Sequence, residues 1–166
     1  MLKLTNYALD AFVMLCKYRK YYSCAQTGTY SLLCSYQTCL SGWSLVHFSC
    51  RRLIPGSVTQ PTAKANCQAI CGHLALVSSS GELAAVQTFI KSEGLGSRKG
   101  VWVDGSDAAQ EGVWLTSDGK VMTYIGFTRG QPNGGKNANC MMLFEMEVWD
   151  ENCNRVDYSY ATLCEL

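Results

Sequence analysis

Cysteine is the residue type with the greatest capacity for chemistry in this sequence. The chain has 166 residues and contains ten cysteines, an even number and a high share for its length. Thiols at this density can form disulfides, bind zinc or act as nucleophiles, and each use needs its own spacing and partners. An even count in a small, loop-rich chain favours a disulfide framework, which forms in an oxidising extracellular setting. We therefore expect a secreted protein.

The other uses of cysteine have little support in the sequence. The nearest approach to a zinc motif is the segment 67–73, C-Q-A-I-C-G-H, and no second half matches it. His47 and His73 stand alone, and Cys–His catalysis would need a free reactive thiol beside one of them. The glycine-rich stretch 126–135 lacks the Lys-Ser/Thr ending of a phosphate loop. The sequence therefore gives no support for zinc-binding, Cys–His or phosphate-loop chemistry, and we expect no enzyme.

Composition limits the partners. The net charge is +1, so bulk charge gives no support for binding nucleic acid. Hydrophobic residues make up 48% and charged residues 16%, which suits a packed core and excludes a disordered chain or a coiled coil. No apolar run approaches the roughly 20 residues of a membrane-spanning helix, and we expect no transmembrane segment.

Residues 1–38 differ in character from the rest of the chain. Lys3 precedes an apolar stretch at residues 7–16, which is the arrangement of a short signal peptide. Asp10 interrupts the stretch and no clean cleavage site follows, so a degenerate or mispredicted N-terminal extension is an equal alternative. Three cysteines in this part leave open a link between chains, and hence an oligomer: Cys16, Cys24 and Cys34.

From residue 39 onward, local patterns predict two helices. Thr59-Gln60-Pro61 is a helix start with proline in the first turn, and Gly72 stands where a helix usually ends. Ser79 with Glu82 three residues later forms a capping box for a second helix, which ends near residue 94.

Strands and one long loop complete the pattern. Residues 43–53, 74–77, 101–103, 121–125 and 140–149 have the composition of strands. Residues 128–139 are polar and glycine-rich, and a loop of that length inside a small domain is usually functional. Two helices followed by strands indicate an α+β fold.

Several segments, taken in order, resemble the C-type lectin domain. They are C-L-S-G-W at 39–43 with Cys50, the run 67–74, W-V-D-G-S-D at 102–107, E-G-V-W at 111–114, Q-P-N at 131–133, and Trp149 before Cys153. The resemblance covers residues 39–166 and implies one domain with the long-form C-type lectin-like fold. In that fold two helices pack on small antiparallel sheets, disulfides staple the chain, and a long loop binds calcium.

The resemblance also implies a disulfide pattern. Three pairs follow from it: Cys39–Cys50, Cys67–Cys164 and Cys140–Cys153. Cys71 departs from the family, which usually has a small residue there. Pairing with Cys34 or another upstream cysteine, and a free thiol, stay open for it.

Sugar-binding members hold a calcium ion in the long loop, and two neighbouring sugar hydroxyls complete its coordination. When the family's ligand positions are transferred to this chain, Gln131 and Asn133 fall on the two ligands that flank the motif proline. The peptide bond before that proline is often cis in the family. Asp150 falls where the family usually has Asn, and Glu151 where it usually has Asp. We expect these four residues to bind both Ca²⁺ and sugar.

Departures from the family pattern weaken this expectation. Ala138 stands where sugar-binding members usually have Glu, so one carboxylate ligand is missing. The interval between Trp149 and Cys153 is one residue shorter than usual. We therefore expect calcium binding no tighter than about 10⁻⁴–10⁻³ M, or its loss.

An auxiliary calcium site of some members is partly kept. Asp107 and Glu111 have its spacing, whereas Gly134 and Ala138 stand where further acidic ligands would be. The alternative interpretation, which we favour, is that Asp107 caps a turn and Glu111 is a surface carboxylate.

Two functions follow from the resemblance. The first is a secreted calcium-dependent lectin that recognises glycans in an immune or adhesive role. Gln131 with Asn133 mixes the galactose-type and mannose-type patterns, so the sugar class stays undecided. The second is a calcium-independent lectin-like domain that binds protein, a mineral surface or lipid.

Overall fold

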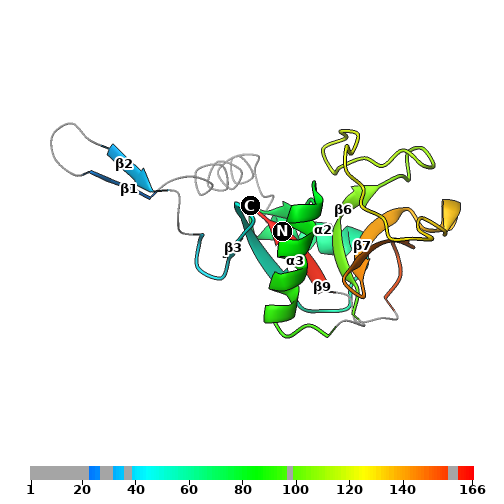
Figure 1. Cartoon of the computed structure of the whole chain (residues 1–166), viewed down its shortest axis with the longest axis horizontal. Helices are drawn as coiled ribbons and strands as arrows, with labels where there is room; N and C mark the ends of the chain where they lie inside the picture. Colours follow the sequence, from blue (N-terminus) through cyan, green and yellow to red (C-terminus); the bar gives the residue numbers. More distant parts are fainter. Residues whose placement is uncertain (1–22, 27–31, 36–38, 97–98, 157–160) are drawn as a thin grey trace, which may run out of the picture.

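The chain is described by a computed structural model over residues 23–26, 32–35, 39–96, 99–156 and 161–166 (Figure 1). In the N-terminal part, β1 (Ser23–Gln26) and β2 (Leu32–Ser35) form an antiparallel hairpin. The prediction of a signal peptide falls on residues outside the described ranges. No helix within those ranges is long and apolar enough to cross a membrane.

Residues from 39 onward form one seven-stranded sheet. Its strands are β3 (Ser44–Val46), β4 (Ser49–Ile54), β5 (His73–Leu74), β6 (Val101–Ser106), β7 (Cys140–Phe144), β8 (Glu147–Glu151) and β9 (Ala161–Glu165). Their order is β3-β4-β9-β6-β7-β8, and β5 also pairs with β9. All pairs are antiparallel except β6 with β9. The last strand of the chain therefore lies in the interior of the sheet, where β4, β5 and β6 all contact it.

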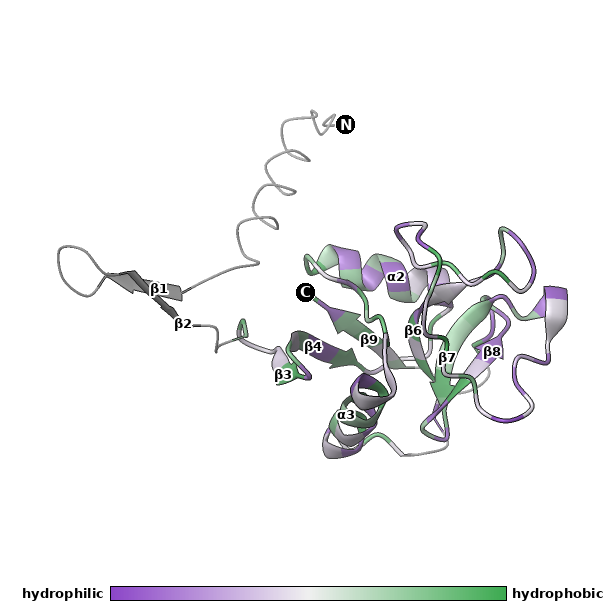
Figure 2. Cartoon of the chain, turned by 45° about the horizontal axis from the view of Figure 1, so that its top comes forward, coloured by the Kyte–Doolittle hydropathy of each residue, from purple (hydrophilic) through white to green (hydrophobic). Residues whose placement is uncertain are grey.

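The two helices, α2 (Gln60–Ala69) and α3 (Ser80–Ser92), pack on opposite faces of this sheet (Figure 2). Strand alternation explains the arrangement, because successive side chains of a strand point to opposite faces. In β6, Val101 and Val103 join the core cluster that contains the α3 side chains. Trp102, between them, joins the cluster that contains Ala63 and Cys67 of α2. The predicted α+β class, with two helices packed on a sheet, is thus confirmed, and the sheet is mixed because β6 and β9 run parallel.

Both helix starts agree with the sequence. Thr59 Oγ1 accepts the N–H of Thr62 at 3.3 Å at the start of α2, and Ser79 Oγ accepts the N–H of Glu82 at 3.1 Å at the start of α3. The end of α2 differs in detail, because the residue with left-handed backbone is Cys71 (φ 64°) and not Gly72. Gly72 is needed for space instead: a Cβ there would lie 2.8 Å from the Glu165 carbonyl oxygen.

Several predicted strands have different limits. Residues 43–53 form the hairpin β3–β4 and residues 140–149 the hairpin β7–β8, each with two non-glycine residues of positive φ at its turn. The strand predicted at 74–77 is shortened to β5. The strand predicted at 121–125 is wrong, since this segment makes only an isolated bridge between Leu115 and Val121. Met122 of this irregular segment is buried in the core, whereas Val121 is 66% exposed, so the strand-like composition does not correspond to a strand.

Three disulfides have both cysteines among the described side chains, and all three pairings agree with those implied by the family. They are Cys39–Cys50, Cys67–Cys164 and Cys140–Cys153. Cys71 is also disulfide-bonded, so it is not a free thiol, and its partner lies outside the side chains that the structure describes.

A buried ion cluster joins both ends of the domain to α3. Arg51 of β4 is fully buried and forms ion pairs with Glu82 of α3 and with Glu165 of β9, the latter at 3.3 Å. Its guanidinium also donates to the carbonyl oxygen of Leu76 at 3.2 Å. Burial alone would raise the pKa of Glu82. Hydrogen bonds from the Ser78 hydroxyl and backbone, together with Arg51, outweigh burial and lower that pKa below its usual 4.5.

The Cys67–Cys164 disulfide should stabilise the domain more than the other pairs do. It closes a loop of 97 residues, whereas Cys39–Cys50 spans 11. In the chain-entropy model these loops correspond to about 4.7 and about 2.8 kcal/mol, because the unfolded chain loses more freedom when a longer loop is closed. Urea titrations of Cys67→Ala/Cys164→Ala and of Cys39→Ala/Cys50→Ala should show the larger loss for the first double variant. Equal losses would contradict this ranking.

Replacing Glu82 by Gln should lower the free energy of unfolding by about 3–5 kcal/mol, because the buried Arg51 charge loses one of its two partners. Glu93→Gln is the matched control, since Glu93 is exposed at the end of the same helix. Urea titration at neutral pH measures both. A loss below about 1 kcal/mol for Glu82→Gln would show that Glu165 alone compensates Arg51.

The same variant gives a pH dependence with a defined sign. Because the folded state lowers the pKa of Glu82 below 4.5, its stabilising effect is complete above that pH and is lost as the pH falls through the folded pKa. The difference in stability between the wild type and Glu82→Gln should therefore shrink in acid. A difference that is constant between pH 7 and pH 3 would contradict the assignment.

Candidate functional site

The polar loop lies against β8, the strand at one edge of the sheet (Figure 1). It contains the short 3-10 helix η1 (Gly135–Asn137). At its start, the N–H of Thr128 donates to the Val148 carbonyl oxygen at 3.2 Å, and the Thr128 hydroxyl donates to Glu147 at 2.6 Å. At its end, the Ser106 hydroxyl donates to the Asn139 carbonyl oxygen at 2.6 Å. The loop is therefore fastened at both ends to ordered strands.

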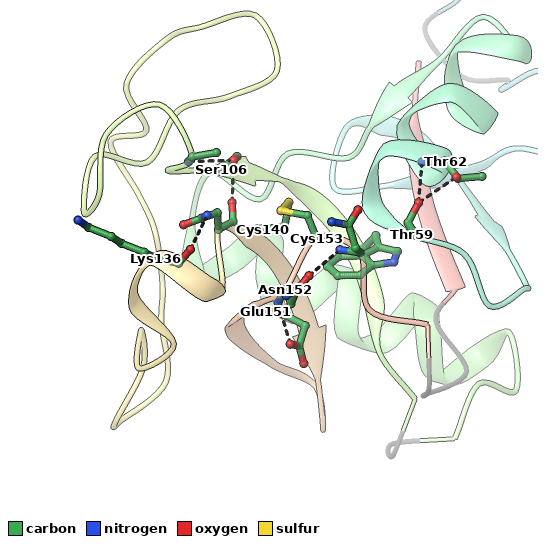
Figure 3. Close-up of a disulfide and its surroundings, with 12 residues drawn as sticks. Thr59, Thr62, Ser106, Lys136, Cys140, Glu151, Asn152 and Cys153 are labelled. Carbon is green, nitrogen blue, oxygen red and sulfur yellow. Dashed lines mark hydrogen bonds between the residues drawn. A yellow bond between two sulfur atoms is a disulfide. The ribbon is translucent and has the colours of Figure 1, made fainter.

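The Cys140–Cys153 disulfide closes the base of this region (Figure 3). It joins the first residue of β7 to the chain that follows β8. On the loop side, the Asn139 side chain donates to the Lys136 carbonyl oxygen at 3.1 Å, and the Lys136 side chain extends away from the disulfide. The cross-link thus fixes the two strands between which the loop emerges.

Asp150 holds the centre of the loop. Its carboxylate is 6% exposed and accepts the backbone N–H of Gly134 at 2.7 Å and that of Asn133 at 3.0 and 3.2 Å. Charge-assisted bonds to backbone amides are among the stronger hydrogen bonds in proteins. Asp150 therefore fixes the two residues that follow Pro132, and the Gln131–Pro132 peptide bond is cis, as it often is in the family.

Gly134 is required for this contact, and the sequence analysis did not single it out for that role. A Cβ on Gly134 would lie 2.1 Å from the Ala138 Cβ and 3.1 Å from Asp150 Oδ2. Position 138 therefore faces the Asp150 carboxylate across Gly134. The exchange of the expected Glu for Ala138 removes a negative charge at the centre of the loop.

The two motif amides differ in their environment. Gln131 Oε1 is enclosed and has no hydrogen-bond partner among the described residues. Most buried polar atoms in folded proteins have a partner, so an enclosed acceptor without a donor is a candidate ligand atom. Asn133, two residues later, is exposed to solvent. One amide thus faces inward and the other outward at the same bend.

Glu151 is engaged differently from Asp150. Its carboxylate accepts the N–H of Asn152 at 2.7 Å and forms an ion pair with Arg155 at 3.2 Å. Adjacent residues of a strand point to opposite faces, and Asp150 shares its face with the core residue Val148. The structure thus brings Gln131, Asn133 and Asp150 to one bend. The part of Glu151 in that site stays a prediction.

The auxiliary pair is only partly assembled. Asp107 is 3% exposed; its Oδ2 accepts the N–H of Gly112 at 3.0 Å, and its buried Oδ1 has no hydrogen-bond partner in the described part of the chain. Asp107 therefore does cap a turn. Glu111 is exposed, and its Oε1 lies 4.0 Å from the point where a Cβ on Gly135 would be. Across the described part of the chain, no group of three or more His, Cys, Asp or Glu side chains is placed to hold a metal.

The sequence analysis did not identify Asp104, a second buried carboxylate that fixes a loop segment. Asp104 of β6 is buried and accepts the N–H of Ser117 at 2.9 Å and its hydroxyl at 2.5 Å. An acidic residue inside the apolar strand V-W-V-D was the available signal, because a buried carboxylate needs nearby donors. This contact fixes the 107–117 segment beside the long loop.

The tryptophans are structural. Trp102 and Trp114 are buried in the two core clusters. Trp149 is half-buried and meets Phe144 edge to face, with ring centroids 5.5 Å apart. Their side chains pack the sheet and do not form an exposed platform for stacking a sugar.

Comparison with known proteins shows which proteins this chain resembles. The family model described as the Lectin C-type domain matches residues 56–166. The chain is 26% identical over 130 residues to an alpha-N-acetylgalactosamine-specific lectin of Patiria pectinifera, covering 75% of this chain and 77% of the relative. It is 31% identical over 96 residues to the galactose-specific lectin nattectin of Thalassophryne nattereri, covering 58% of this chain and spanning 60% of nattectin.

Among solved structures, a calcium-independent type II antifreeze protein superposes with a TM-score of 0.66. The two are 26% identical, and the match covers 78% of this chain and 94% of the antifreeze protein. The matched family model spans the two helices and the strands from β5 to β9, with the loop and two of the three disulfides between them. The chain therefore belongs to the C-type lectin domain family.

Proposed function

We propose that this protein is a secreted carbohydrate-binding lectin whose site is the bend at residues 131–134, with a weakly bound Ca²⁺ ion. The observation that carries the proposal is the enclosed Gln131 Oε1, which has no donor among the described residues although it lies in a loop that Asp150 holds in place. A cation or a hydroxyl at this bend would supply the missing partner.

The candidate ligand atoms are oxygens, which Ca²⁺ accepts, but only one of the three residues that supply them carries a charge. Amide and carboxylate oxygens are ligands that Ca²⁺ accepts, and Gln131, Asn133 and Asp150 supply them. The Asp150 oxygens already accept backbone hydrogen bonds, so few of their lone pairs remain for a metal. This supports affinity in the weak extracellular range of about 10⁻⁴–10⁻³ M.

Each residue has a separate role in this proposal. When bound, the calcium ion supplies a positive charge and open positions that two neighbouring sugar hydroxyls can occupy. The Gln131 and Asn133 amides can donate and accept at once, so each can bind a hydroxyl beside the metal. Asp150 keeps the bend in place through the backbone of Asn133 and Gly134. Pre-organisation of this kind lowers the entropy lost on binding.

Galactose-configured sugars are the first ligands to test. The two lectins reported above are named for galactose and for N-acetylgalactosamine, which share the same arrangement of the 3- and 4-hydroxyls. The two amides of this chain fit either hydroxyl layout, so mannose-type ligands belong in the same experiment.

A second candidate function is calcium-independent binding of a protein, a mineral surface or lipid. Two features favour it: Ala138 removes a carboxylate from the loop, and Glu151 is neutralised by Arg155. The similar antifreeze protein is itself described as calcium-independent, so the fold exists without that ion.

Glycan binding should need both calcium and Asn133. A glycan array probed with the full chain should give signal on galactose-type or mannose-type ligands that disappears with a chelator. Asn133→Ala should weaken binding about tenfold or more, because it removes a ligand and two hydrogen-bonding groups. Asn137→Ala is the matched control, an exposed asparagine in the same loop. Signal that resists the chelator, or no signal at all, would favour the second candidate.

Replacing Asp150 by Asn should loosen the bend, because the amide keeps only one acceptor oxygen where the carboxylate uses both for the Asn133 and Gly134 N–H groups. The loss of a buried acceptor should lower the free energy of unfolding by about 1–3 kcal/mol. Hydrogen exchange followed by NMR should show faster exchange at the Asn133 and Gly134 amides. Asp118→Asn is the control, since Asp118 is exposed and pairs with Lys120 on the surface. Unchanged exchange would contradict the role given to Asp150.

A further inference from the structure

The bend at residues 131–134 contains the dipeptide Asn133-Gly134, whose covalent chemistry the proposed function does not use. The side chain of an asparagine has an electrophilic carbonyl carbon, Cγ, and the backbone nitrogen of the next residue can attack it to close a five-membered ring. A side chain on that next residue crowds the attack, so glycine leaves the nitrogen most accessible. Asn-Gly is therefore the asparagine dipeptide most prone to spontaneous deamidation.

The packing of the loop requires glycine after Asn133. A Cβ on Gly134 would lie 2.1 Å from the Ala138 Cβ, a separation that real Cβ atoms do not adopt. Asn133 itself is exposed, and its side chain makes no hydrogen bond within the described part of the chain. The reactive dipeptide is thus imposed by the fold, and its electrophilic side chain is free to move.

The attacking nitrogen, in contrast, is held by Asp150. The Oδ2 atom of this buried carboxylate accepts the Gly134 N–H at 2.7 Å. Ring closure needs the Gly134 nitrogen to lose its proton and to approach Asn133 Cγ. The hydrogen bond keeps the proton on the nitrogen, and the adjacent negative charge disfavours the amide anion that attacks. Asp150 therefore restrains the reaction, which proceeds when the bend opens locally.

We propose that Asn133 is a deamidation site whose rate Asp150 sets, and that its conversion to aspartate gives the bend a second carboxylate. The Gly134 nitrogen gives its proton to water and forms a bond to Asn133 Cγ. The bond from Cγ to the side-chain nitrogen breaks, and that nitrogen takes up a proton and leaves as ammonia. Water then opens the cyclic imide: attack at Cγ gives aspartate, and attack at the backbone carbonyl carbon gives isoaspartate. The net reaction converts an amide and water to a carboxylic acid and ammonia, without an oxidant or a co-reactant.

The consequence for the bend rests on the proposed function. Among Gln131, Asn133 and Asp150, only Asp150 carries a charge, and Ala138 stands where a further carboxylate was expected. An aspartate at position 133 adds a second negative charge beside the bend. Because calcium affinity rises with the number of charged ligands, the deamidated protein should bind Ca²⁺ more tightly than the newly made chain does.

Peptide mass spectrometry after incubation of the folded full chain at neutral pH tests the modification. Trypsin cleaves after Arg129 and Lys136, so the fragment 130–136 carries Asn133 as its single asparagine, and fragmentation separates its amide from that of Gln131. The Asn133 amide should convert to a carboxyl. Asn137 is the internal control, because it is exposed in the same loop but is followed by alanine, and it should stay largely unconverted.

The restraint by Asp150 is tested with the same measurement. Asp150→Asn should raise the rate of conversion about fivefold or more, because it weakens the hydrogen bonding that keeps the bend closed. Asp118→Asn, at an exposed position, should leave the rate unchanged. Urea gives the answer for the wild type even if Asp150→Asn does not fold, since conversion should be faster in the unfolded chain. No conversion of Asn133, equal conversion of Asn137, or equal rates in the folded and the unfolded wild type would each overturn the proposal.

The thermal midpoint, measured against calcium concentration, tests the consequence separately. Asn133→Asp should reach half of its calcium-induced shift at a concentration about fivefold lower than the wild type needs, because a second unit charge attracts the cation. Asn137→Asp is the matched control for added charge in the loop and should follow the wild type. A wild-type shift that Asn133→Asp leaves unchanged would overturn the consequence but not the proposed function. No shift in either protein would overturn both, and the mass measurement would still decide the modification.

Discussion

The return of the C-terminal strand to the interior of the sheet is the constraint on which this domain depends. β9 pairs with β4, with β5 and with β6, so three parts of the chain that are far apart in sequence meet on it. Bringing such distant segments together lowers the entropy of the chain before the stabilising contacts between them have formed. The Cys67–Cys164 disulfide joins α2 to β9, and Arg51 joins β4 to both α3 and β9. A covalent bond and a buried charge cluster therefore secure the same closure.

Once that closure exists, the long loop needs little structure of its own. Its ends are fixed by Val148 and Ser106, and its middle by Asp150. Each anchor belongs to a strand of the sheet, so the loop takes its rigidity from the sheet. This explains why a segment so polar and rich in glycine can hold amide oxygens in place. It also explains why the loss of one carboxylate at position 138 need not alter the fold.

Local signals in the sequence predicted what depends on local geometry. Both helices follow from their N-caps at Thr59 and Ser79, because a cap acts on amides two or three residues away. The disulfide pairs followed from the family resemblance alone, since no spacing rule selects among so many cysteines. Residues 121–125 show the limit: they have the composition of a strand, but a strand also needs a neighbouring strand with free hydrogen-bonding groups. Here the segment meets only Leu115, in an isolated bridge with Val121, and no neighbouring strand extends beside it.

The candidate site was predictable in part for a similar reason. The motif residues could be placed on one loop from their order, but the partner of each carboxylate depends on the whole fold. Asp150 and Glu151 are neighbours with the same charge, yet strand alternation gives one to the loop backbone and the other to Arg155.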